Sequence, residues 1–310
     1  MATLRVRLLG RVCIQHGQSS LEGLDLRKVQ ELFCYLLLYR DRPHHRETLA
    51  SILWEEASMN QSKANLRKAL WQLQAALSEC CATSEHHILV VDSDWIQINP
   101  RADLWLDVAL LEQAFTHVKG LSGEQIHAEH ACAIEQAVQV YHGDLLDGWY
   151  QDWCVYERER LQNIYLALLN KLMDHCETHH AYEQGLVYGT QILRYDQARE
   201  QTHRCMMRLH FLAGDRTAAL RQFAHCTTVL KEELGVEPTE LTVELQEQIK
   251  HNCLDDNSPA LLTNGHHEDS AAPFMGVLKH LKQLQHALAE MQQQVRQDIQ
   301  TVEQALQNRR

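Results

Sequence analysis

The sequence lacks the features of a membrane protein. It contains no run of eighteen apolar residues, and no basic segment followed by an apolar one near Met1. A bilayer-spanning helix needs about twenty apolar residues, and a secretory signal needs a basic start and an apolar core. We therefore expect a cytoplasmic protein without membrane contact.

Motifs of common enzyme and metal sites are also missing. The chain has no Walker loop, no G-x-S-x-G, no G-x-G-x-x-G and no H-E-x-x-H. None of the ten cysteines forms a Cys-x-x-Cys pair, so we interpret them as small buried hydrophobic residues. His175 and His179 have the spacing of one edge of a zinc site, but a solvated helix face is the simpler interpretation. We predict no catalytic activity, no cofactor and no bound metal.

Acidic residues outnumber basic residues in the whole chain, but not in its first hundred residues. The formal net charge is −12, whereas residues 1–100 hold eleven Lys/Arg and eleven Asp/Glu. All of the excess acid therefore follows residue 100. Phosphate contacts depend on local charge, because acid on a distant domain is screened over about 8–10 Å. The first hundred residues could thus bind DNA, although weakly, and we expect a need for pairing on DNA.

The segment from Asn60 to Leu77 is the most informative. Apolar residues recur at steps of three and four, which predicts one buried helix stripe: Ala64, Leu66, Ala69, Leu70, Leu73 and Leu77. Three basic residues and three amides lie between them: Lys63, Arg67, Lys68, Asn65, Gln72 and Gln74. A helix of this kind suits the major groove of DNA. By itself, it could equally be an ordinary amphipathic surface helix.

The surrounding residues favour a helix-turn-helix. We predict helices over 26–40 and 46–54, a turn over 55–60, and then the basic helix. Two β-rich runs within 87–99 flank Asp92-Ser93-Asp94 and predict a hairpin, the wing of a winged helix. Two further strands are expected around the break at Gly10.

At this point the sequence resembles a known family. The motifs in order are Leu8-Leu9-Gly10, Arg27-Lys28, Leu36-Leu37-Leu38, Arg46-Glu47-x-Leu49, Leu53-Trp54 and Ala64-Asn65-Leu66-Arg67-Lys68-Ala69-Leu70. They are similar to the OmpR-like winged helix of the Streptomyces antibiotic regulatory proteins. Later motifs resemble the family's bacterial transcriptional activator domain, which is related to tetratricopeptide repeats: Asp103-Leu104-Trp105-Leu106-Asp107, Tyr141-His142-Gly143-Asp144, Glu157-Arg158-Glu159-Arg160-Leu161, Gly214-Asp215-Arg216 and Glu233-Leu234-Gly235-Val236-Glu237-Pro238.

The resemblance implies a DNA-binding transcription regulator, an activator that binds promoter repeats and recruits RNA polymerase. Double-stranded DNA and RNA polymerase are the expected partners. The implied DNA-contacting residues are Lys63, Asn65, Arg67, Lys68 and Gln72, with Arg46 placed to meet a phosphate. Trp95 in the wing either packs in the core, which we favour, or lies on the minor groove. Gln72 and Gln74 stand where the resemblance would give extra Arg.

The predicted fold class is mostly α, in four parts. An α+β winged helix spans 1–100, an all-α tetratricopeptide-like activator domain spans 101–251, and a linker rich in Pro, Gly, Asn and Asp spans 252–273. Within the second part we expect helices over 108–118, 129–141, 156–176, 181–193, 199–213, 216–234 and 239–251. Gly185 and Gly189 fall inside one of them, which predicts close helix packing or local softness.

Residues 274–310 have a heptad pattern. Leu281, Leu288, Val295 and Val302 recur every seven residues, and Leu284 and Met291 lie between them. A seam this narrow predicts a coiled coil, and hence a homodimer. The open alternative is a helix that folds back on the activator domain. For the whole chain, the competing function is a signalling or ligand-sensing adaptor whose winged helix makes protein contacts.

Overall fold

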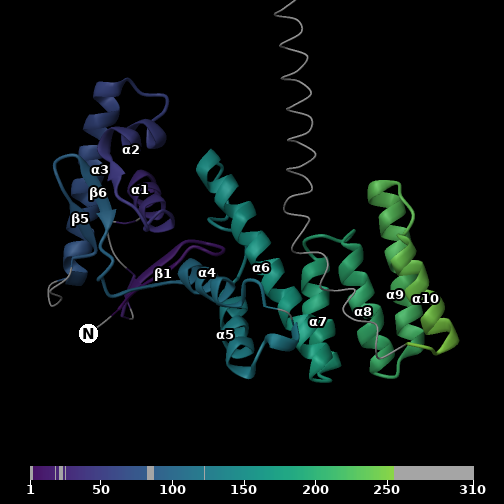
Figure 1. The fold of residues 1–310 in the computed structure, drawn as a ribbon. Helices are drawn as coiled ribbons and strands as arrows, with labels where there is room; N and C mark the ends of the chain where they lie inside the picture. The colour runs from purple at the N-terminus through teal and green to yellow at the C-terminus, as the bar shows by residue number, and fades with distance from the viewer. Residues whose placement is uncertain are drawn as a thin grey trace, which may run out of the picture. The chain divides into compact units, whose positions relative to one another are not determined.

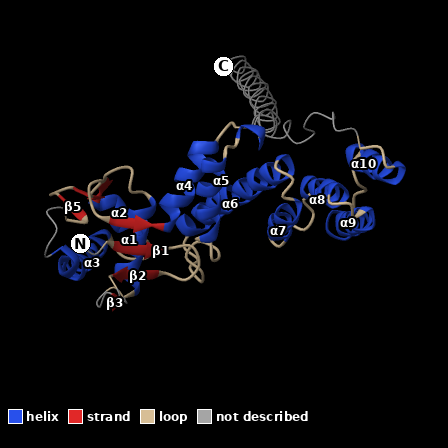
Figure 2. Cartoon of the chain, turned by 90° about the horizontal axis from the view of Figure 1, so that it is seen from below, coloured by secondary structure: helices blue, strands red, loops and turns tan. Residues whose placement is uncertain are grey.

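The computed structural model describes residues 3–17, 19, 20, 24, 26–81, 87–121 and 123–254. By Cα proximity the chain divides into two compact units, 1–250 and 251–310, so the description concerns the first unit almost entirely. Strands gather near the N-terminus beside α1, α2 and α3, and helices alone follow from α4 onward (Figures 1 and 2).

A four-stranded sheet with the order β3-β2-β1-β7 opens the fold. It comprises β1 (Leu4–Arg7), β2 (Cys13–His16), β3 (Ser19–Ser20) and β7 (Leu104–Leu106). Alternation sets its buried face, because Leu4 and Val6 are buried while Arg5 is exposed. The first two strands are antiparallel, whereas β7 runs parallel to β1 and pairs Leu4 with Leu104. Residues almost a hundred positions apart thus share one sheet.

Three helices form the next layer: α1 (Arg27–Leu38), α2 (Arg46–Leu53) and α3 (Met59–Cys81). The core of this layer is apolar, with Phe33, Leu49 and Leu73 fully buried. Ser62 fixes the entry into α3: its hydroxyl donates to the carbonyl oxygens of Trp54 at 3.1 Å and Ser58 at 3.1 Å. The short turn between α2 and α3 is therefore held by a buried hydroxyl at the first turn of the long helix.

A second, three-stranded sheet has the order β4-β6-β5. The hairpin of β5 (Leu89–Val91) and β6 (Trp95–Ile98) pairs with β4 (His44–His45), which immediately precedes α2. Ile96 and Ile98 are buried against the helices. The strand pairing thereby attaches the wing to the N-terminal end of α2.

Asp107 ties the N-terminal sheet to the helices that follow. Its buried carboxylate accepts hydrogen bonds from the backbone N–H groups of Leu8 and Leu9, at 2.8 Å to Oδ2 in each case. Burial raises the pKa of Asp107, and these N–H groups act against that rise by favouring the carboxylate. Leu9 also forms an antiparallel bridge with Leu145, so β1 is followed by a contact with the segment before α6.

The rest of the described chain is helical. Its helices are α4 (Asp107–Val118), η1 (Gly123–Gln125), α5 (Ala128–Gln139), α6 (Asp152–Thr178), α7 (Tyr182–Leu193), α8 (Glu200–Leu212), α9 (Arg216–Val229), the π-helical turn η2 (Leu230–Leu234) and α10 (Glu240–His251). From α6 to α9 each helix packs against the next (Figures 1 and 2). A Cβ added to Gly185 would lie 2.9 Å from Leu209 Cδ1, and one on Gly189 would lie 2.7 Å from Met206 Cγ. Close packing is therefore the reason for both glycines.

Several expectations need correction in detail. The sequence pattern did not predict β7, and it started α6 at residue 156 although the helix begins at Asp152. His44, which precedes α2, is buried, and its Nε2 lies 2.8 Å from the carbonyl oxygen of Tyr39. Ala64, assigned to the buried stripe, is exposed. The predicted dimer seam of 274–310 and nearly all of the predicted linker lie outside the described residues.

Candidate nucleic-acid interface

One face of α3 is buried and the other is open. The buried face carries Ser62, Leu66, Ala69, Leu70, Leu73, Ala76 and Leu77, all at most 6% exposed. The side chains on the opposite face include Arg67, Lys68 and Trp71, which are exposed. Trp71, at 70% exposure, was not among the predicted site residues. Its position four residues after Arg67 would have placed it on the same helix face.

The predicted contact residues of α3 fall into two rows at helical spacing. Lys63 and Arg67 lie on one side of the open face, beside Gln74, which was not a predicted contact, and Asn65, Lys68 and Gln72 lie on the other. The structure leaves Asn65 and Gln72 half-buried, whereas Arg67 and Lys68 are exposed. The exposed cations thus stand at the centre of the face, with amides along its edges.

Lys63 is not a free cation. Its Nζ lies 2.5 Å from Oε1 of Glu47, a residue in the first turn of α2. The hydrogen bond from this ammonium, together with its charge, lowers the pKa of the Glu47 carboxyl. Both side chains are largely exposed, so solvent screens the pair. Of the three basic residues predicted on α3, Lys63 is therefore the one already paired with an acid.

A chain of contacts joins this ion pair to the wing. The backbone N–H of Glu47 donates to Nδ1 of His45 at 3.3 Å, and the His45 ring packs edge-on against Trp95 at 5.1 Å between centroids. Trp95 is 47% exposed, so the favoured core position for this residue is wrong. Trp95 therefore stands on the same side of the wing as β4 and the start of α2.

Arg46 is directed to the wing turn. Its Nη1 donates to the carbonyl oxygen of Ser93 at 3.1 Å, and its backbone N–H donates to the carbonyl oxygen of Asp94 at 2.9 Å. The wing turn is acidic, because Asp92 and Asp94 are both exposed beside Ser93. The basic residues of this face are thus bordered by acid at two places, the wing turn and Glu47.

The His, Cys, Asp and Glu side chains are scattered over the described part of the chain. No group of three or more His, Cys, Asp and Glu side chains there could hold a metal ion. His175 and His179 do lie together, with ring centroids 4.0 Å apart. Five of the eight described cysteines are buried as expected, while Cys132 and Cys253 are exposed. None of the described helices is long and apolar enough to cross a membrane.

Comparison with known proteins identifies a domain family in residues 106–250. The model of the bacterial transcriptional activator domain matches residues 106–250. Regulatory protein AfsR of Streptomyces coelicolor is 24% identical over 249 residues, which are 79% of this chain and 24% of AfsR. The chain thus spans about a quarter of the length of that relative.

A solved structure has a similar fold. Mycobacterium tuberculosis EmbR, determined in complex with a low-affinity phosphopeptide, superposes with a TM-score of 0.70 at 16% sequence identity. The match covers 83% of this chain and 67% of EmbR. These comparisons assign residues 106–250 to the bacterial transcriptional activator domain, show that most of the chain has a fold similar to that of EmbR, and find a sequence similar to AfsR.

Proposed function

We propose that this chain binds promoter DNA through α3 and activates transcription by recruiting RNA polymerase. The observation that carries the proposal is the open face of α3, where Arg67 and Lys68 are exposed above a fully buried apolar stripe. Guanidinium and amide groups on such a helix can read base edges in the major groove, and ammonium groups can neutralise phosphates. AfsR, the relative named above, is a regulatory protein, which agrees with this role.

The other candidate contacts have different roles in this proposal. Asn65 and Gln72 reach bases from the edge of the face, and Trp95 approaches the minor groove beside the wing. Arg46 already donates to the wing turn, so it positions the wing and reaches a phosphate only if that contact opens. Lys63 contacts a phosphate in competition with Glu47.

The proposal also assigns a separate role to each part of the chain. Residues 1–100 bind DNA, 101–251 form the activator domain with tetratricopeptide-like helix pairs, and 274–310 pair two copies through Leu281, Leu284, Leu288, Met291, Val295 and Val302. Pairing would offset the weak electrostatics of a neutral winged helix, because tethering raises the local concentration of the second domain. The packing of each helix from α6 to α9 on the next supports the repeat-like arrangement.

The alternative is a signalling or ligand-sensing adaptor whose winged helix contacts protein. The acids beside the basic face, Glu47, Asp92 and Asp94, favour it, because carboxylates near a phosphate backbone oppose binding. Under this alternative, the open face of α3 would receive an acidic protein surface rather than DNA.

Binding of genomic fragments tests the proposal. The full chain is incubated with fragmented DNA, and bound fragments are sequenced and then measured singly by mobility shift. Arg67→Ala is expected to cost about 1–3 kcal/mol on the selected sites if the side chain reads a base. Arg11→Ala is the matched control, since Arg11 is exposed in the same part of the fold but far from α3 in sequence.

Two outcomes oppose the proposal. Enrichment of no fragment at moderate salt would favour the adaptor. Equal losses for the Arg67 and Arg11 variants would mean that α3 contributes only charge and reads no base.

A further inference from the structure

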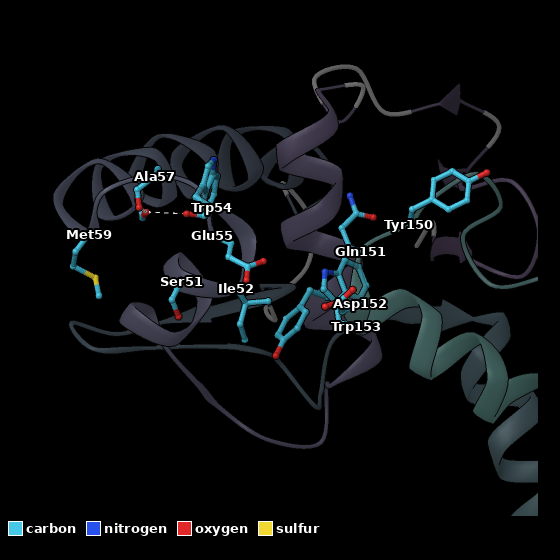
Figure 3. A pocket seen from close by; sticks show the side chains of 12 residues that line it. Ser51, Ile52, Trp54, Glu55, Ala57, Met59, Tyr150, Gln151, Asp152 and Trp153 are labelled. Carbon is cyan, nitrogen blue, oxygen red and sulfur yellow. Dashed lines mark hydrogen bonds between the residues drawn. The ribbon is translucent and has the colours of Figure 1, made fainter.

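A cavity of about 780 Å³ lies beside the α2–α3 turn, away from the open face of α3. One wall comes from residues 51–59 at the end of α2 and the start of α3, and another from residues 150–153 at the start of α6 (Figure 3). Tyr35 of α1 completes the lining. Its volume lies within the range of about 300–1,000 Å³ that is typical of small-molecule sites.

The cavity is aromatic. Tyr35, Trp54, Tyr150 and Trp153 all line it. Large apolar side chains at its rim are exposed to an unusual degree: Tyr150 is 83% exposed, Met59 53% and Ile52 37%. A cluster of exposed apolar side chains around one hollow is typical of a site that is covered when a ligand binds.

The lining carries negative charge. Its only charged side chains are Glu55 and Asp152, and neither has an ion-pair partner in the described part of the chain. Figure 3 shows the carboxylate of Glu55 pointing toward the segment that carries Asp152 and Trp153. At the C-terminal end of α2 the Leu53 carbonyl oxygen accepts a hydrogen bond from the Lys28 ammonium at 2.8 Å, so the negative charge of the lining comes from its two carboxylates. The N-terminal end of α6 acts against this, but Asp152 in its first turn offsets it.

Indole rings in this region already hold cations. The guanidinium of Arg27 lies 4.0 Å from the ring centroid of Trp149, and the ammonium of Lys28 lies 5.9 Å from that of Trp54. The two cations share one carboxylate, Glu31, which lies 3.0 Å from Arg27 and 2.7 Å from Lys28, and neither cation lines the cavity. The indole N–H of Trp153 is buried and has no hydrogen-bond partner in the described chain, so this donor is available for a hydrogen bond to a ligand.

We infer that this cavity binds a small organic cation with an apolar or aromatic body, of the amine or quaternary ammonium class. The aromatic rings attract the cation through their π faces, the two carboxylates supply the counter-charge, and the Trp153 N–H donates to a hydroxyl or carbonyl of the ligand.

A ligand bound in this cavity would affect DNA binding through α3. Trp54 and Ser62 line the cavity, and the Ser62 hydroxyl donates to the Trp54 carbonyl oxygen at the first turn of α3. A ligand that moves the turn therefore moves the start of the DNA-facing helix. This last consequence rests on the proposed function, whereas binding of the cation does not.

Titration calorimetry without DNA tests the binding. The full chain is titrated with benzyltrimethylammonium and phenethylammonium, and with benzyl alcohol and phenylacetate as neutral and anionic probes. Both cations are expected to bind at least about fivefold more tightly than the neutral probe. Glu55→Gln and Asp152→Asn should each weaken cation binding about two- to fivefold, in line with exposed ion pairs. Glu56→Gln, the exposed neighbour outside the cavity, should leave it unchanged.

Trp153→Phe gives an independent measurement. It removes the N–H but keeps an aromatic ring, and it should weaken binding of benzyl(2-hydroxyethyl)dimethylammonium, which carries a hydroxyl acceptor, more than binding of benzyltrimethylammonium, which does not. The inference is overturned if no cation binds, if the neutral or anionic probe binds equally well, or if Glu56→Gln weakens binding as much as Glu55→Gln. A cation that binds as expected but leaves DNA affinity unchanged would overturn only the coupling to α3.

Discussion

Lys63 and Glu47 form an ion pair across the corner between α3 and α2, with 2.5 Å between Nζ and Oε1. A lysine that was expected to neutralise a phosphate is thus already neutralised by a carboxylate. Binding a phosphate there requires exchange of one anion for another, which releases less free energy than pairing a free ammonium.

Replacing Glu47 should therefore strengthen DNA binding. Glu47→Gln frees the Lys63 ammonium, and we expect affinity to rise severalfold and the slope of log K against log salt to steepen by about one unit. Fluorescence anisotropy on a selected site at four salt concentrations measures both. Glu56→Gln removes the same charge from an exposed neighbour. If it produces the same change, net charge and not the pair is responsible, and the gain should vanish in Glu47→Gln combined with Lys63→Ala.

Asp174 should make stability fall as pH rises. Burial raises the pKa of this carboxyl from about 3.8 to about 7. The folded protein therefore holds the proton where the unfolded chain has lost it, and stability present below pH 3.8 is lost progressively as pH approaches 7. Asp174→Asn should be more stable than the parent at pH 8 by on the order of 4 kcal/mol, relative to their difference at acid pH.

Denaturant unfolding at several pH values between 4 and 8 measures this difference. Asp41→Asn, at an exposed turn, serves as control and should show no such trend. A gap between the Asp174→Asn variant and the parent that stays constant across this range would show that Asp174 titrates normally.

A methyl group added at Gly189 should weaken the packing of α7 on α8 and lower the stability of the protein. Gly189→Ala places a Cβ 2.7 Å from Met206 Cγ and 3.0 Å from Met173 Cε. Overpacking costs about 1–3 kcal/mol, which outweighs the gain of up to about 1 kcal/mol from replacing a helical Gly. Combining it with Met206→Ala should be less costly than the sum of the two single changes, by more than about 0.5 kcal/mol. Strict additivity in thermal unfolding would contradict the close approach.

The tail should set the oligomeric state. Leu281→Asp with Leu288→Asp would bury charge in the predicted seam, so we expect monomers in sedimentation and the largest loss of DNA affinity on fragments with two sites. Gln283→Asp with Gln293→Asp, outside the seam, should remain dimeric. A chain ending at Lys250 should keep its melting temperature, because residues 1–250 form one compact unit. A dimer that survives the leucine changes would move the interface to the helical domain, and a large fall in melting temperature would mean that the tail docks on it.

The local sequence pattern was sufficient to predict where most of the helices begin. From α4 to α10, six of the seven α-helices begin within about one residue of the expected position, because turn residues such as Gly214 and Asp215 mark the boundaries. The start of α6 was missed by four residues. Its first turn holds the buried Cys154 and also Trp153, whose ring packs edge-on against Tyr35 of α1, and helical periodicity does not predict such contacts.

Contacts between distant residues could not be predicted in the same way. Glu47 and Lys63 are sixteen residues apart, and only the α2–α3 corner brings them together. Likewise, three residues, Leu104 to Leu106, are too few for a strand signal, and their partner strand begins at Leu4. The exposure of Trp95 agrees with alternation along β6, where Ile96 and Ile98 are buried and Trp95 lies on the opposite face, so the favoured core position overlooked a signal that the sequence holds.

The parallel pairing of β1 with β7 has a consequence for the order of events at the ribosome. The N-terminal strand leaves the exit tunnel about a hundred residues before the strand and the Asp107 carboxylate that complete its edge. Such distant pairing is slow to form, and an unpaired strand edge is open to association with other chains. The strand β1 is thus synthesised well before the residues that complete its edge, and nascent chains halted before residue 107 should depend more on a chaperone than longer ones.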